Sequence, residues 1–119
     1  MRDHTKVKVF QAADRLAILV YKMTRTFPRE EQSGLTSQMR RAAVSVPSNI
    51  VEGCARPTEA NYIRFLGTSF ASLRELQYQG SLVHRLGYCK DDARQAFDAL
   101  CTEVSKMLGA MIRSLRSEQ

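Results

Sequence analysis

The chain has 119 residues, of which 44% are hydrophobic and 25% are charged, and its formal net charge is +6. This composition is typical of one soluble globular domain and argues against a disordered chain. No apolar run approaches the roughly 18 residues of a membrane span, and the N-terminus is polar rather than signal-like, so we expect a cytoplasmic protein without a membrane partner.

The three cysteines, Cys54, Cys89 and Cys101, are odd in number and irregularly spaced. Each lies in or beside an apolar helical pattern. Free thiols in a reducing compartment are therefore expected rather than a disulfide framework.

The first predicted element is a helix from about residue 7 to residue 27. Its apolar residues recur at alternating spacings of three and four, the pattern of a helix that buries one face. These positions are Phe10, Ala13, Ala17, Val20, Thr24 and Phe27, with Leu16, Leu19 and Met23 widening the face. The helix should end before Pro28, because a residue that precedes proline disfavours helical dihedral angles. In the charged linker that follows, Ser33 is a candidate N-cap for the next helix.

The second predicted helix, residues 35–54, has an unusual distribution of side chains. One side of the helix carries a narrow polar stripe, and most of the remaining circumference carries apolar or small side chains. The stripe consists of Arg41, Ser45, Ser48, Glu52 and Arg56. Because a surface helix needs an apolar arc of only about 100°, this helix should be covered from two sides. We assign one side to the core of the bundle, namely Met39, Ala42, Val46 and Ile50. The other side is assigned to an interface with a second subunit, namely Val44, Pro47, Val51 and Glu52.

Pro47 lies in the middle of this second helix. It removes one backbone N–H and clashes with the carbonyl of Ala43, at a cost of about 3 kcal/mol in isolation, so we predict a bend there. The short polar side chains of Ser45, Ser48 and Asn49 are placed to bond the backbone groups that the proline leaves open.

The third predicted helix covers residues 58–86 and the fourth covers residues 91–116. Thr58 and Asp91 are the expected N-caps, and Gly87 is expected to end the third helix in a left-handed conformation. Both helices carry seams with a period of about 3.5 residues, which predicts left-handed, coiled-coil-like packing. The seam of the third helix is Tyr62, Leu66, Ser69, Leu73, Leu76, Gly80, Val83 and Gly87, and that of the fourth is Ala93, Phe97, Leu100, Val104, Met107, Met111 and Leu115.

Four such helices with short connections predict an all-α fold. The expected architecture is an antiparallel up-down-up-down left-handed four-helix bundle whose second helix is bent at Pro47. No repeat, low-complexity tract or linker-like boundary divides the sequence. Residues 1–119 are therefore expected to form a single domain.

Signatures of catalysis and metal binding are missing from the sequence. His4 and His84 are isolated, and neither belongs to the HExxH or Glu-x-x-His patterns of zinc and di-iron proteins. There is no glycine-rich phosphate loop, and Cys54 has no histidine near it in sequence to activate it. We therefore predict no catalytic residue, no metal site and no cofactor, in a protein that is not an enzyme.

The basic residues offer the best candidates for a functional surface. Arginine outnumbers lysine, which suits bidentate contacts with phosphate. The candidate nucleic-acid contacts are Arg40, Arg41, Arg56, Arg64, Lys22 and Arg25. A solvated charged face is the alternative for each of them, and Arg113 and Arg116 lie where the dipole of the fourth helix favours cations anyway. Glu52 is placed either for an ion pair with Arg41 or Arg56 or for a subunit contact.

The same region resembles a known family. The match is carried by Arg40-Arg41-Ala42-Ala43 leading into Ser45-Val46-Pro47-Ser48-Asn49-Ile50-Val51-Glu52-Gly53, with Phe27-Pro28 before it and Arg56 and Phe65-Leu66 after it. These residues closely resemble the small four-helix-bundle proteins encoded in intervening sequences of bacterial 23S rRNA genes. The family also includes the accessory variability determinants of diversity-generating retroelements. Its usual pattern has Ile in place of Val46 and Ala in place of Val51.

The resemblance implies a four-helix bundle that assembles as a ring, typically a homopentamer, and that has no catalytic site. In the retroelement branch such proteins bind a reverse transcriptase and nucleic acid through a basic surface, and in the rRNA-associated branch RNA binding is the suspected role. Two functions therefore stand side by side. One is an oligomeric bundle that binds RNA or another nucleic acid, and the other is a scaffold or adaptor for a protein partner such as a reverse transcriptase.

Overall fold

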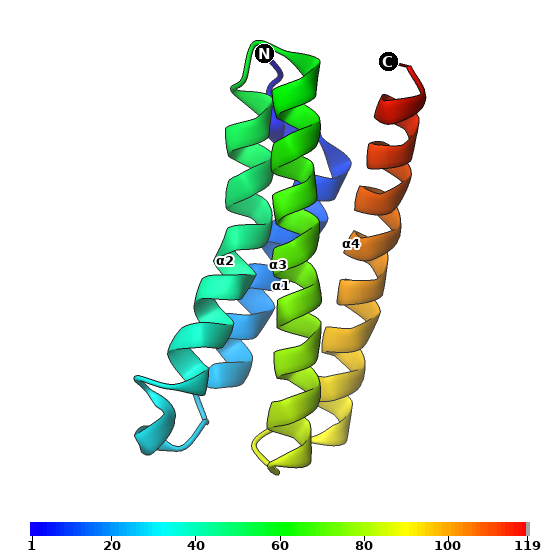
Figure 1. Cartoon of the computed structure of the whole chain (residues 1–119). Coiled ribbons are helices and arrows are strands. Elements are labelled where there is room, and N and C mark those ends of the chain that lie inside the picture. Colours follow the sequence, from blue (N-terminus) through cyan, green and yellow to red (C-terminus); the bar gives the residue numbers. More distant parts are fainter. Residues whose placement is uncertain (119) are drawn as a thin grey trace.

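The computed structural model describes residues 1–118 and consists, over these residues, of helices and their connections (Figure 1). The long helices are α1 (Lys8–Thr24), α2 (Leu35–Cys54), α3 (Glu59–Arg85) and α4 (Asp91–Ser117), and the short 3-10 helices η1 (His4–Lys6) and η2 (Arg29–Glu31) precede α1 and α2. The predicted all-helical class is confirmed. None of these helices is long and apolar enough to cross a lipid bilayer.

The four long helices lie side by side in a molecule that measures 45 × 24 × 20 Å (Figure 1). α2 packs against α1 and α3, and α4 packs against α3 and α1. The connections between α1 and α2 and between α3 and α4 lie at one end, whereas the α2–α3 connection lies at the other end beside the N-terminus. Each helix therefore has two neighbours and turns its remaining face to solvent.

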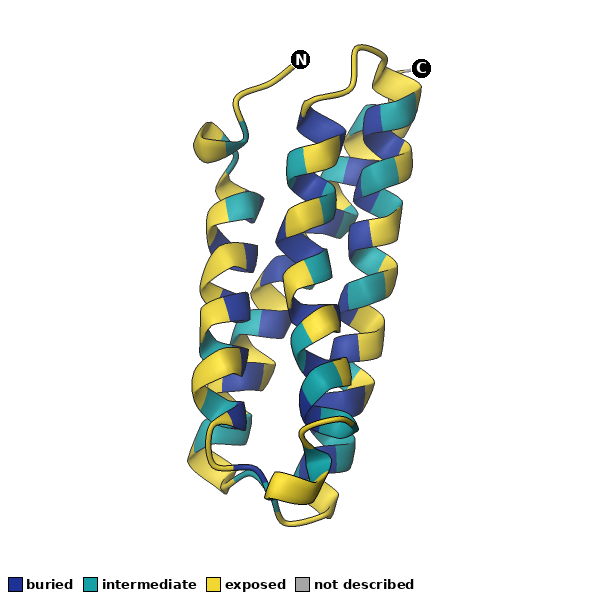
Figure 2. Ribbon diagram, turned by 90° about the vertical axis from the view of Figure 1, so that its left-hand side faces the viewer, coloured by how far each residue is buried: buried dark blue, intermediate teal, exposed yellow. Residues whose placement is uncertain are grey.

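The core is formed by the inward face of every long helix (Figure 2). The residues of α2 assigned to the core are all buried, which confirms that assignment; they are Met39, Ala42, Val46 and Ile50. The predicted seam of α3 is likewise buried from Tyr62 to Val83. The core of these two helices could thus be predicted from the spacing of apolar residues.

The buried face of α4 differs from the predicted seam. Phe97 and Val104 are buried as expected, but the other predicted positions are only half-buried, namely Ala93, Leu100, Met107, Met111 and Leu115. The buried column is Phe97, Cys101, Val104, Leu108 and Ile112. Its spacings of four, three, four and four residues follow the turn of a straight α-helix more closely than a 3.5-residue repeat.

The ends of α3 follow the predicted pattern. The side chain of Thr58 accepts a hydrogen bond from the N–H of Asn61 at 3.3 Å. At the other end Gly87 has a φ of +81°, and the N–H of Tyr88 donates to the carbonyl of Val83 at 2.9 Å. This is the closure that a glycine in the left-handed region permits.

Two predicted caps are wrong. Gly34, rather than Ser33, precedes α2, and the N–H of Leu35 donates to Oε1 of Glu31 at 3.2 Å. α4 is preceded by Lys90, and Asp91 lies in its first turn. The negative charge of its side chain still interacts favourably with the positive end of the helix dipole.

α2 continues as one helix through Pro47, which is buried within the chain. Asn49 donates to the carbonyl of Ser45 at 2.8 Å, which is not the carbonyl of Ala43 that Pro47 leaves without its helical donor. Ser69 of α3 supplies a bond that the sequence did not suggest, donating to the carbonyl of Val46 at 2.7 Å. Pro47, assigned to a subunit interface, thus offers little surface to a neighbour. α1 and α3 of the same chain cover much of the apolar arc of α2.

Burial keeps two cysteines in their thiol form. All three cysteines are free, as predicted, and Cys54 and Cys101 are buried. Loss of hydration raises the pKa of the Cys101 thiol to about 12 and also raises the pKa of Cys54, because burial disfavours the thiolate. Neither side chain is accessible to solvent as a reactive cysteine is.

Candidate nucleic-acid interface

The six basic residues predicted as nucleic-acid contacts do not form one patch. They fall into two groups at opposite ends of the bundle: Lys22, Arg25, Arg40 and Arg41 near the α1–α2 connection, and Arg56 and Arg64 near the start of α3. At a rise of about 1.5 Å per residue, Arg40 and Arg56 are separated by roughly 24 Å along the axis. They cannot contact the same phosphate group.

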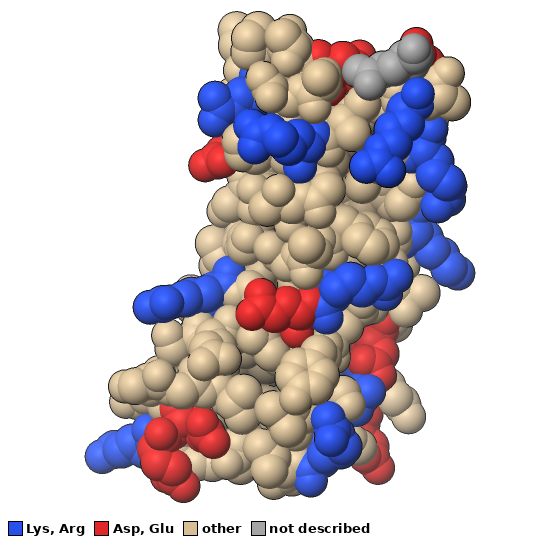
Figure 3. Space-filling view, in the orientation of Figure 1, with Lys and Arg blue, Asp and Glu red and all other residues tan. Residues whose placement is uncertain are grey.

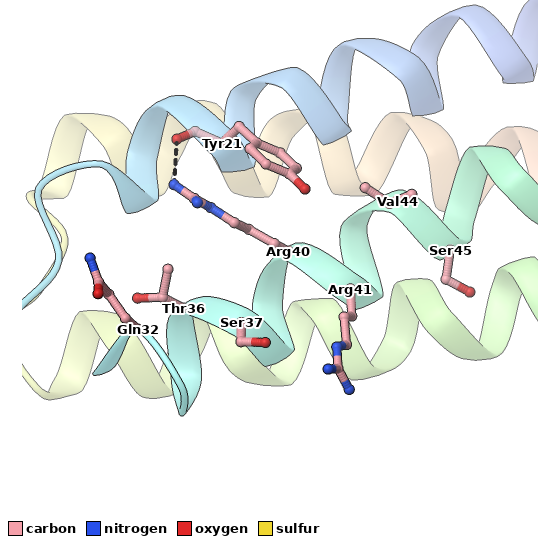
Figure 4. Close-up of a pocket in the computed structure, with 8 residues that line it drawn as sticks. All are labelled: Tyr21, Gln32, Thr36, Ser37, Arg40, Arg41, Val44 and Ser45. Atoms are coloured by element: carbon pink, nitrogen blue, oxygen red, sulfur yellow. Dashed lines mark hydrogen bonds between the residues drawn. The ribbon is translucent and has the colours of Figure 1, made fainter. Parts of the chain in front are cut away.

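Arg40 is held by α1. Its Nε donates to Oγ1 of Thr24 at 2.7 Å and its Nη2 donates to the carbonyl of Tyr21 at 3.5 Å (Figure 4). The guanidinium also lies 4.6 Å from the centroid of the Tyr21 ring. These contacts join α1 to α2 and leave fewer of the five N–H donors for a ligand.

The Arg41 side chain lies about 100° further around α2 and extends away from Arg40, although both arginines line one groove (Figure 4). It is exposed and helps line a surface groove of about 610 Å³ together with Tyr21, Val44 and Ser45. Lys22 and Arg25 are also exposed. Within residues 1–118, Glu52 forms no ion pair with Arg41 or Arg56.

Arg56 and Arg64 meet over one aromatic ring. Their guanidinium groups lie 4.7 Å and 4.6 Å from the centroid of Phe65. Nε of Arg64 also donates to Oδ1 of Asn61 at 3.5 Å. A guanidinium stacked on a ring keeps N–H groups free at its edge, where a phosphate can bind.

A larger group of cations lies on α3 and α4. Residues 60–74 and residues 104–117 contain no aspartate or glutamate. We call their five basic side chains the α3–α4 basic face: Arg64, Arg74, Lys106, Arg113 and Arg116. The two segments are adjacent, because Gly67 and Phe70 of α3 line one groove with Gly109 and Arg113 of α4.

This groove has a volume of about 360 Å³ and is bordered by Arg113 and Arg116. The guanidinium of Arg74 lies 4.8 Å from the centroid of the Phe70 ring. A Cβ at Gly109 would lie 3.2 Å from Nη1 of Arg113, so the absence of a side chain there lets Arg113 fold back along α4 toward Phe70.

The positive charges of the α3–α4 basic face are not neutralised by ion pairs. All five side chains are exposed, and none of them takes part in the four ion pairs within residues 1–118. In the upper half of Figure 3, basic side chains surround an uncharged centre and the acidic ones lie at its margins. The first half of α4 has the opposite character, with Asp91, Asp92, Asp98 and Glu103.

Sequence-based selection included only Arg64 of this face. The sequence feature that could have indicated this face is the pair of segments without acidic residues. Glu59 and Glu75 bound the first segment, and Glu103 and Glu118 bound the second. Each segment alone looks like a solvated helix surface. Only the packing of α3 on α4 places their charges on one face.

Comparison with known proteins gives a consistent assignment. No curated protein matches the sequence significantly. Among solved structures, a protein of unknown function from the S23 ribosomal protein family of Bacteroides thetaiotaomicron is similar over 88% of this chain and 95% of its own, with a TM-score of 0.80 and 21% identity. That likeness shows a shared fold. The family model described as "23S rRNA-intervening sequence protein" matches residues 5–110, which is most of the chain. The chain therefore belongs to the 23S rRNA-intervening sequence protein family.

Proposed function

We propose that this protein is a non-enzymatic, oligomeric helical bundle that binds RNA or another nucleic acid through the α3–α4 basic face. The observation that carries the proposal is the gathering of five exposed, unpaired cations on two adjacent acid-free segments. Phosphate groups are the natural ligands of such a surface, because each contact releases condensed counterions from the nucleic acid. The family's association with 23S rRNA genes makes a structured RNA the first ligand to test.

The oligomeric part of the proposal is a ring, a homopentamer by the family resemblance. It is supported by apolar side chains on α1 and α2 that remain exposed in the single chain: Ile18 at 51%, Tyr21 at 43% and Val44 at 39%. Val51 and Glu52, predicted at the interface, extend this surface along α2. A ring would also multiply the net charge of +6 and strengthen attraction to a polyanion.

Finer features of the fold belong to the same proposal. They are the left-handed, up-down-up-down winding of the bundle and a bend of α2 at Pro47. The free thiols support a cytoplasmic location.

Binding is tested by removing charge from the face. The triple variant Arg74→Gln, Arg113→Gln and Arg116→Gln should bind a structured RNA much more weakly than the wild type at about 50 mM salt, where phosphate contacts are least screened. The control is Lys8→Gln, Arg29→Gln and Lys90→Gln, which removes the same charge from exposed positions elsewhere. Fluorescence anisotropy measures both. Equal losses in the two triples would show that net charge, and not this face, drives binding.

The second candidate is a scaffold or adaptor for a protein partner such as a reverse transcriptase. The exposed apolar residues Ile18, Tyr21 and Val44 favour it, because they can be buried by another protein as well as by a second subunit. A pull-down that recovers one protein equally well with and without nuclease treatment would favour this role. Loss of that protein in a Val44→Asp variant would locate the contact.

A further inference from the structure

Arginine side chains lie over several aromatic rings of the bundle. Five guanidinium groups lie within 5 Å of a ring centroid: Arg2 over Tyr62, Arg40 over Tyr21, Arg56 and Arg64 over Phe65, and Arg74 over Phe70. Protein structures show roughly one such contact for every 70–80 residues. Each of these rings therefore carries a cation against one of its faces.

This arrangement decides which part of a nucleic acid the α3–α4 basic face can contact. Proteins that bind single strands stack the unpaired bases on free aromatic rings. Phe65 and Phe70 of α3 each carry at least one arginine. A base that stacks on the occupied face of either ring must displace the guanidinium.

The same contacts prepare the arginines for phosphate. A guanidinium held against a ring has lost much of its rotamer freedom before binding, so less entropy is lost when its N–H groups contact an anion. Arg64 and Arg74 are thus held in place before a ligand binds, each against a ring and with one hydrogen bond to a neighbour on α3. Arg113 instead folds back over Gly109.

The cations form two lines on two helices. Arg64 and Arg74 are roughly 15 Å apart along α3, and Lys106 and Arg116 are roughly 15 Å apart along α4. A fixed array of this kind suits a ligand whose phosphates are also fixed in space. A duplex meets this condition, whereas a flexible single strand must be ordered on binding.

We propose that the α3–α4 basic face binds the phosphate backbone of double-helical nucleic acid without reading the base sequence. This inference rests on the proposed function and names the form of nucleic acid that the face accepts. Duplex RNA and duplex DNA share the phosphate chemistry, and separate arms of the experiment distinguish them.

The test compares five ligands by fluorescence anisotropy over a series of salt concentrations. They are an RNA duplex of about 20 base pairs, the DNA duplex of the same sequence, one single strand of each, and an RNA duplex of unrelated sequence. With five phosphate contacts, log K plotted against log [salt] should have a slope of about −4.5 for a duplex and about −3.5 for a single strand. If the two ligands bind equally at about 1 M salt, this difference gives about a tenfold preference for the duplex at about 0.1 M. The two RNA duplexes should bind equally well, because the base sequence is not read. Comparison of the RNA duplex with the DNA duplex of the same sequence then shows which sugar the face prefers.

Tyr78 supplies the control for base stacking. It lies on α3, is 60% exposed, and no arginine within residues 1–118 lies over its ring. Tyr78→Leu should leave duplex affinity unchanged, whereas Arg113→Gln should reduce the duplex salt slope by about 0.9. Circular dichroism and thermal melting check that both variants fold.

Two results would overturn the inference while leaving the proposed function intact. They are tighter binding of the single strands, or weaker binding by Tyr78→Leu. If none of the five ligands binds at about 50 mM salt, the proposed function fails together with the inference.

Discussion

Gly80 of α3 lies directly against the ring of Phe97 of α4, and no side chain fits between them. A Cβ at Gly80 would overlap Cε2 of Phe97 and lie 2.8 Å from Cζ. Phe97 is fully buried, so its ring cannot move into solvent to make room. The glycine therefore sets how closely α3 and α4 approach, and it supports the adjacency on which the α3–α4 basic face depends.

Gly80→Ala is expected to destabilise the protein, although alanine favours helix by about 1 kcal/mol over glycine. Overpacking of a filled core typically costs about 1–3 kcal/mol, and here it outweighs the gain in propensity. Gly67 of the same helix is the matched control, since a Cβ there would have no neighbour within 4 Å. Gly67→Ala should stabilise by roughly 0.5–1 kcal/mol. Urea denaturation measures both, and stabilisation by both variants would disprove the close contact.

Ser69→Ala is expected to lower the free energy of unfolding by about 1–3 kcal/mol. Its fully buried hydroxyl donates to the carbonyl of Val46 beside Pro47, and removal leaves that carbonyl with one bond fewer in a buried site. Thr68→Ala is the control, because the hydroxyl of Thr68 is exposed and bonds the carbonyl of Arg64 in its own helix. It should change stability by less than about 0.5 kcal/mol. Thermal unfolding measures both variants, and an equal loss of stability in the two would contradict the role given to Ser69.

Arg40→Ala and Arg41→Ala are expected to differ, although the residues are neighbours in sequence. Arg40 bonds Thr24 and Tyr21 of α1, so its loss should destabilise the fold by about 1–2 kcal/mol. Arg41 is exposed and extends away from Arg40, and its loss should stay within about 0.5 kcal/mol. Chemical denaturation checks this. Equal effects would mean that the link from Arg40 to α1 does not stabilise the protein.

Stability is expected to fall as the pH rises above about 9. Burial raises the pKa of Cys101 to about 12 and that of Tyr62 to about 12. Above the pKa values of the unfolded chain, the unfolded state releases these protons while the folded state retains them, so the unfolded state is favoured. Cys101 alone should contribute a slope of at most about 1.4 kcal/mol per pH unit. Denaturation between pH 8 and pH 10 should show a shallower decline for Cys101→Ala, and an unchanged decline would contradict the raised pKa.

The helices and most of the core could be predicted because their signals are local. Gly34 and Pro57 mark the two ends of α2, and the spacing of Met39, Ala42, Val46 and Ile50 identifies its inward face. The caps were less predictable because several short polar residues compete at each end. Ser33 was a plausible cap, yet the carboxylate of Glu31 bonds the first N–H of the helix.

What could not be predicted depends on contacts between helices. The buried column of α4 is shifted from the expected seam because packing on α3 and α1 selects the face, and the apolar side chains around α4 allowed more than one choice. Arg40 looked like a ligand contact in sequence, but its partners lie on α1. The α3–α4 basic face joins segments that are more than 25 residues apart, so its charges add up only in the folded chain.

The salt dependence of duplex binding tests the central claim most directly. Wild-type protein should lose roughly 500-fold in affinity between 50 mM and 200 mM salt if five phosphates are contacted. The triple variant of Arg74, Arg113 and Arg116 to Gln should have a slope smaller by about 2.7, whereas the triple variant of Lys8, Arg29 and Lys90 to Gln should keep the wild-type slope. Equal slopes for the wild type and the first variant would contradict binding through the α3–α4 basic face.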